Sequence, residues 1–127
     1  DEEYVNILPP AQWLSSYVFF TDPTYTTTNL VIVRKADASG TFSDVNVDCL
    51  GAITDWTPVA DGSQYQMARP DMIRINPVGT CTNGRHTASS SGAFTVMVWG
   101  LANFASYAYP AGGNVGKINP VVVIGRH

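Results

Sequence analysis

Charge is scarce in this sequence of 127 residues: only 13% of them are charged, and the seven Lys and Arg residues form no cluster. Phosphate binding needs a concentrated positive surface, so nucleic acid is a poor candidate partner. Long apolar runs are also missing, and a run such as Pro120–Gly125 is far too short to cross a bilayer. The composition therefore argues against both nucleic-acid binding and membrane insertion.

The first three residues, Asp1–Glu3, are acidic, whereas a secretory signal peptide begins with positive charge. The length suits one domain, and hydroxyl and amide side chains take the place of charges as the main polar groups. Such a composition is typical of extracellular β-domains. We expect residues 1–127 to form a single β-sandwich domain excised from a larger secreted or surface protein.

Catalytic signatures are missing as well. The glycines of Gly112–Gly116 lack the preceding strand and following helix of a nucleotide-binding loop. His86 is expected to be a solvated side chain in a turn. Five aspartates could supply a carboxylate pair for glycoside cleavage, but turn chemistry alone explains them; they are Asp44, Asp48, Asp55, Asp61 and Asp71. The sequence predicts a protein that is not an enzyme.

The two cysteines and two histidines do not have the spacing of a metal site, so the sequence predicts neither a metal nor a cofactor. Calcium is the open alternative, because Asp44, Asn46 and Asp48 alternate along one segment and offer oxygen ligands. Polar residues on the solvent face of a strand explain the same alternation.

Only two cysteines are present, Cys49 and Cys81. In a secreted chain an even count predicts a disulfide, and here a single pairing exists. The alternative is a pair of buried thiols in a reducing compartment.

Short runs of β-branched and aromatic residues between turn signals are abundant. No segment keeps a 3.6-residue period, and Pro or Gly interrupts nearly every window of twelve residues. The pattern predicts an all-β fold, an antiparallel β-sandwich or jelly roll with about eight to ten strands. Asn29–Lys35 is apolar on both faces and is expected to be central, Ala93–Trp99 is the strongest strand, and Ser89–Gly92 is expected to be a flexible link.

Several segments occur in an order that resembles the repeating half of the IgGFc-binding protein N-terminal domain family. They are Leu8–Phe19, Val45–Asp48, Trp56, Tyr65, Gly84 with His86, Phe94–Gly100, and Ser-Tyr-Ala-Tyr-Pro-Ala-Gly at Ser106–Gly112. Members of the family occur in mucus proteins and in large bacterial surface proteins, so the resemblance implies an extracellular, cell-surface location. The antibody-Fc binding for which the family is named is not carried over to this chain.

The tyrosines of Ser106–Gly112 have two interpretations. Alternation along a strand places Tyr107 and Tyr109 on the same side, and Pro110 ends the pairing. We interpret them mainly as a structural pair whose hydroxyls reach the backbone at an edge of the sandwich. Contact with a ligand is the alternative.

We interpret the chain as a non-catalytic extracellular adhesion or recognition module that binds a glycan or a protein through loops at one end. The candidate loops are residues 21–29, 80–92 and 101–107, and the candidate ligand-binding residues are Tyr25, Arg85, His86, Asn103 and Tyr107. The alternative is a structural or assembly domain, such as the spacer or tip of a homo-oligomeric fibre, with a trimer as one plausible state. Its basis is Val121–Ile124, an apolar run that needs cover on both faces.

Overall fold

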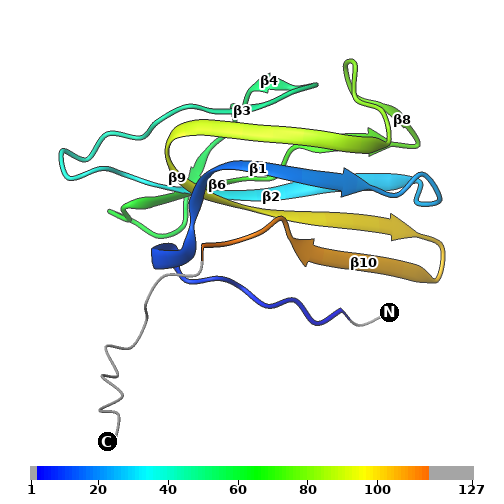
Figure 1. Ribbon diagram of the computed structural model, residues 1–127, viewed down its shortest axis with the longest axis horizontal. Helices are drawn as coiled ribbons and strands as arrows, with labels where there is room; N and C mark the ends of the chain where they lie inside the picture. The colour runs from blue at the N-terminus through cyan, green and yellow to red at the C-terminus, as the bar shows by residue number, and fades with distance from the viewer. Residues whose placement is uncertain (1–2, 115–127) are drawn as a thin grey trace, which may run out of the picture.

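The computed structural model describes residues 3–114, which form an antiparallel sheet of ten strands that curls into a half-barrel (Figure 1). The strands are β1 (Leu14–Thr21), β2 (Thr27–Lys35), β3 (Val45–Val47), β4 (Gly51–Ala52), β5 (Thr57–Pro58), β6 (Tyr65–Ala68), β7 (Asp71–Arg74), β8 (Asn76–Pro77), β9 (Gly84–Ala102) and β10 (Ala105–Pro110). The predicted all-β, sandwich-like fold is therefore confirmed.

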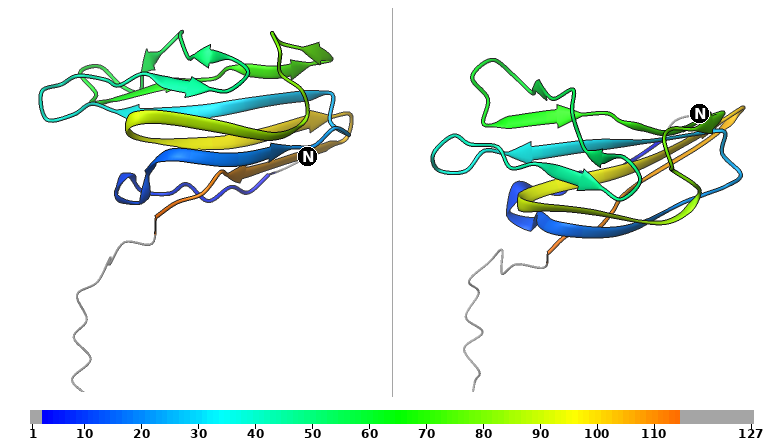
Figure 2. Two further views of the ribbon diagram at one scale, coloured as in Figure 1. Left: turned by 45° about the horizontal axis from the view of Figure 1, so that its top comes forward. Right: turned by 90° about the horizontal axis from the view of Figure 1, so that it is seen from above.

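The long strand β9 belongs to both sides of the half-barrel, because it bends back on itself (Figure 1). Its first half pairs with β1 and β3, and its second half pairs with β2 and β10. The strands β6 and β7 extend the sheet beyond β2, and β5 follows β6. Figure 2 shows the two sides facing each other across the interior.

The prediction of a flexible link at Ser89–Gly92 is wrong, because these residues lie within β9. Ser89 and Ser90 pair with Asn46 and Val45 of β3, so their backbone is part of the sheet. Gly92 packs closely on Ser43, and an added Cβ would lie only 3.0 Å from the Ser43 Oγ. A serine-rich run reads as a loop by composition, but neighbouring strands on both sides hold this one in an extended conformation.

The core lies between the two sides and follows the alternation of the strands. Phe94, Val96 and Val98 of β9 are fully buried, as are Leu30 and Ile32 of β2. Successive residues of a strand point to opposite faces, so these residues form one inward row on each strand. The prediction that β2 is central is confirmed, because β2 pairs with β9 on one side and with β6 and β7 on the other.

Helical structure within residues 3–114 is limited to η1 (Pro10–Gln12), a single 3-10 turn that begins with a proline. None of the helices in this range has the length and apolar character needed to span a bilayer. Val121–Ile124, which the sequence predicts to be an apolar strand covered on both faces, lies outside the described residues.

Candidate functional site

Turns that join neighbouring strands meet at one end of the molecule, at the right of Figure 1. The register explains this, because Thr27 of β2 lies opposite both Arg74 of β7 and Leu101 of β9, and Leu101 lies opposite Ser106 of β10. The turns next to these residues therefore share one edge. We call this edge the loop end; it comprises the β1–β2 turn (residues 22–26), Ile75, and the β9–β10 turn of Asn103 and Phe104.

Two large apolar side chains at the loop end face solvent. Phe104 is 98% exposed and Ile75 is 80% exposed. Both residues have positive φ angles, 60° for Phe104 and 65° for Ile75, a conformation that bulky side chains rarely adopt. The Ile75 amide donates a hydrogen bond of 2.8 Å to the Thr26 carbonyl, which connects this residue to the β1–β2 turn. Strained backbone that presents apolar side chains to water is typical of a contact surface.

Three tyrosines pack behind this edge. The Tyr25 ring meets the Tyr107 ring edge to face, with centroids 4.6 Å apart, and Tyr107 stacks on Tyr109 at 6.1 Å. The Tyr107 hydroxyl accepts a hydrogen bond of 3.2 Å from the Asp22 amide. The Tyr109 hydroxyl accepts one of 3.0 Å from the Phe20 amide and donates one to the Phe20 carbonyl. The prediction that both hydroxyls reach the backbone is therefore confirmed.

Burial changes the acidity of these phenols. Desolvation raises the pKa of Tyr107 and of Tyr109 above the ordinary tyrosine value, because burial penalises the phenolate. The hydrogen bonds to the backbone of Asp22 and Phe20 act in the opposite direction but are the smaller effect. Both phenols therefore keep their protons at neutral pH, and the Tyr109 hydroxyl can act as donor and acceptor at once.

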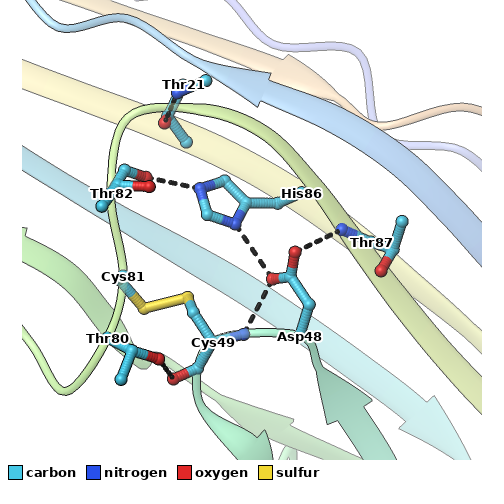
Figure 3. A network of polar contacts seen from close by, with 9 residues as sticks. Thr21, Asp48, Cys49, Thr80, Cys81, Thr82, His86 and Thr87 are labelled. Atoms are coloured by element: carbon cyan, nitrogen blue, oxygen red, sulfur yellow. Dashed lines mark hydrogen bonds and ion pairs between the residues drawn. A yellow bond between two sulfur atoms is a disulfide. The ribbon is translucent and has the colours of Figure 1, made fainter.

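A second polar cluster lies beneath the start of β9 and surrounds a disulfide (Figure 3). The predicted disulfide between Cys49 and Cys81 is present. Next to it, the Asp48 Oδ1 accepts hydrogen bonds from the Cys49 amide at 2.8 Å and from the His86 Nδ1 at 2.9 Å. The Asp48 Oδ2 accepts a longer bond from the Thr87 amide, at 3.3 Å. One carboxylate thus joins the disulfide to β9.

His86 is buried, with only 3% of its surface exposed, so the prediction of a solvated turn side chain is wrong. Its Nε2 faces the Thr82 carbonyl and its Nδ1 faces Asp48. Both partners are oxygen atoms, so each ring nitrogen is already engaged by a contact within the protein. The ring has no free nitrogen to offer a ligand in this arrangement.

The same cluster brings one ligand atom each of Asp48, Cys49 and His86 within 4.8 Å of one another, which is the spacing of a metal site. The Cys49 sulfur is bonded to Cys81, however, and a disulfide sulfur is not a thiolate ligand. Asp48 and His86 are bonded to each other. The donor set therefore fits a structural network better than a metal centre.

The structure does not bring the five predicted ligand-binding residues together at one site. Tyr25 and Tyr107 lie together and are half-buried. Asn103 is exposed in the β9–β10 turn, and Arg85 is exposed on β9 opposite Phe20 of β1. His86 lies in the interior.

Sequence reasoning did not select Phe104 and Ile75, which are the most exposed large apolar residues at the loop end. The signal for Phe104 was an aromatic residue inside a turn, next to Asn103. For Ile75 the signal was misleading, because the alternation of Asp71–Asn76 predicts an inward-facing side chain. The structure ends β7 at Arg74 and turns Ile75 outward.

Taken together, the geometry defines a disulfide-bonded antiparallel β-domain with an apolar, tyrosine-supported loop end. The chain belongs to the IgGFc binding protein family, whose sequence profile matches residues 1–100. The matched range includes Leu8–Phe19 and the His86 segment, but it ends before the Ser106–Gly112 motif. Searches of curated proteins and of solved structures find no match. The family and the disulfide both fit an extracellular recognition module.

Proposed function

We propose that this chain is a non-catalytic recognition module of a cell-surface or secreted protein, and that it binds a protein or glycan partner at the loop end. The observation that carries the proposal is Phe104, which is 98% exposed at the tip of the β9–β10 turn and has a positive φ angle. An apolar ring in this position costs stability and contributes nothing to the core. Contact with a partner gives a reason for its presence.

The surroundings of Phe104 suit a protein partner best. Aromatic residues that are surrounded by polar groups dominate many protein interfaces. Ile75 adds a second apolar side chain, and Tyr25 and Tyr107 support the turn from behind. The family is named for binding the Fc region of IgG, which supports a protein partner as the class of ligand.

The test is a binding screen of the immobilised chain against two probes, the Fc fragment of IgG and a glycan array. The double variant Phe104→Ser with Ile75→Ser should lose binding to whichever probe the wild-type chain captures. Val18→Ser is the matched control, because Val18 is a half-exposed apolar residue of β1 away from the turns. Retained binding by the double variant would place the contact elsewhere. If the wild-type chain binds neither probe, the Fc region and the glycans of the array are excluded as ligands.

A structural or assembly domain is the second candidate function. The apolar side chains of Phe104 and Ile75 are equally suited to contact another copy of the chain. Light scattering at increasing protein concentration separates the two candidates. A mass that rises with concentration, and that the Phe104→Ser variant lowers, favours assembly; a monomer at all concentrations argues against it.

A further inference from the structure

The outer face of the sheet carries a second apolar surface. β2 alternates between fully buried residues such as Leu30 and Ile32 and half-buried Val31 and Val33 on the opposite face. Met97 of β9 lies opposite Val31 and continues the outer row. Strands that are apolar on both faces are generally covered on both faces. Here the core covers one face, and the other is only partly covered.

The uncovered part is a groove, which we call the outer groove. Its deeper section has a volume of about 320 Å³ and is lined almost entirely by apolar residues, chiefly Ile7, Leu8, Trp13, Val31, Met67 and Met97. The Trp13 and Tyr65 rings meet edge to face beside it, with centroids 5.7 Å apart. A shallower section of about 430 Å³ shares Val31, Met67 and Met97 with the first and continues to Asn29 and Trp99.

The chain before η1 forms part of the wall of this groove. Ile7 and Leu8 line it, and the Leu8 carbonyl accepts a hydrogen bond of 3.0 Å from the Trp13 Nε1. At the shallower section, the Trp99 Nε1 and the Asn29 Oδ1 are buried and have no hydrogen-bond partner among residues 3–114. Small side-chain rotations would let these groups bond a carbonyl and an amide. A polypeptide supplies both, whereas a lipid tail supplies neither.

The described chain ends beside this groove. The Asn114 amide donates a hydrogen bond of 2.7 Å to the Gln12 carbonyl, and Gly113 packs so closely on Leu8 that an added Cβ would lie 2.5 Å from the Leu8 Cδ1. In Figure 1 the orange end of the described chain passes η1. Thirteen residues of the sequence, 115–127, follow this point.

We propose that residues 115–127 of this chain bind in the outer groove, with Val121–Ile124 against Val31, Met67 and Met97. The chemistry matches, because four consecutive apolar residues require an apolar surface and the groove supplies one. The reach is sufficient, because the seven residues from Asn114 to Val121 span up to about 23 Å when extended. The nine residues of β2 cover a similar length.

The experiment is a double-mutant cycle in the full chain, read out as the equilibrium constant for unfolding in urea. Val122→Asn removes an apolar side chain from the proposed segment, and Met97→Gln places a polar group on the floor of the groove. Each single variant should raise the equilibrium constant for unfolding. If the two side chains touch, the double variant should raise this constant by about fivefold less, or a still smaller amount, than the product of the two single increases. Val122→Asn combined with Val18→Gln, on the far face of β1, is the control pair and should be multiplicative.

Two further measurements make the result decisive. If Met97→Gln does not fold, Val33→Thr supplies the second position of the cycle. Val122→Asn should also shift the fluorescence of Trp13 and Trp99 toward more solvated tryptophan in protein that is still folded. The proposal would be overturned if the effects on the unfolding constant were multiplicative both for Val122→Asn with Met97→Gln and for Val122→Asn with Val33→Thr. A coupling that appears only at concentrations where light scattering finds dimers would also overturn it, because the occupant would then belong to a second copy.

Discussion

The Tyr109 hydroxyl is bonded to both main-chain groups of Phe20, although 89 residues separate the two in sequence. The contact connects β10 to β1 at the point where one side of the half-barrel meets the other. These two strands do not pair with each other, since each pairs with β9. The hydrogen bonds of one side chain thus join two strands that share no backbone hydrogen bonds.

Replacing this hydroxyl should therefore weaken the fold. Tyr109→Phe leaves the Phe20 amide and carbonyl without their partner, and we expect the free energy of unfolding to fall by about 1 kcal/mol. Chemical denaturation is the measurement. Tyr4→Phe is the control, because Tyr4 is 91% exposed. Equal losses in the two variants would show that the contact contributes nothing specific.

The fold should also lose stability in alkaline solution. Burial is the main cause that raises the pKa of Tyr17, Tyr107 and Tyr109 above the ordinary value of about 10. A raised pKa in the folded state stabilises the fold fully below pH of about 10, and this contribution is lost as the pH rises through the folded-state values. The free energy of unfolding should therefore fall as the pH rises above about 10. Tyr109→Phe should flatten that decrease, and an unchanged slope would contradict the assignment.

The carboxylate of Asp48 should stabilise the fold more than is usual for a partly exposed side chain. It accepts hydrogen bonds from the His86 ring and from the amides of Cys49 and Thr87. Asp48→Asn removes the charge opposite His86, and we expect a loss of about 1–3 kcal/mol in unfolding free energy. Asp61→Asn, an exposed turn residue before Gly62, is the matched control and should be nearly neutral. A neutral Asp48→Asn would mean that the network is not a stabilising one.

Reduction of the disulfide should lower stability substantially. Cys49 and Cys81 close a loop with a sequence separation of 32, and the chain-entropy model gives a contribution of about 3–4 kcal/mol for a loop of that size. The comparison is between oxidised protein and the Cys49→Ser, Cys81→Ser double variant in urea. Similar midpoints for the two proteins would contradict this expectation and weaken the argument for an extracellular location.

Phe104 should cost the folded protein stability. Glycine adopts the observed φ of 60° without steric penalty, so Phe104→Gly should raise the free energy of unfolding by up to about 1 kcal/mol while it removes the exposed ring. Asn103→Gly, at the neighbouring turn position, is the control. Destabilisation by Phe104→Gly would show that the ring makes a structural contribution, which would weaken its proposed role in binding.

The features that the sequence predicted well depend on local periodicity. Alternation identified β2 and the second half of β9, the cysteine count identified the disulfide, and the spacing of Tyr107 and Tyr109 indicated a shared face. The bend of β9 could not be predicted, because a serine-rich run becomes a strand only when β1 and β3 pair with it. The burial of His86 has a similar cause, since its partners Asp48 and Thr82 are brought to it by the fold.

The bend of β9 also affects how the domain unfolds. Neither half of the barrel can detach while the other stays intact, because a single strand supplies hydrogen bonds to both. Local melting that begins at β1 or at β10 would expose the same central strand from either side. The domain is therefore expected to unfold in one cooperative step.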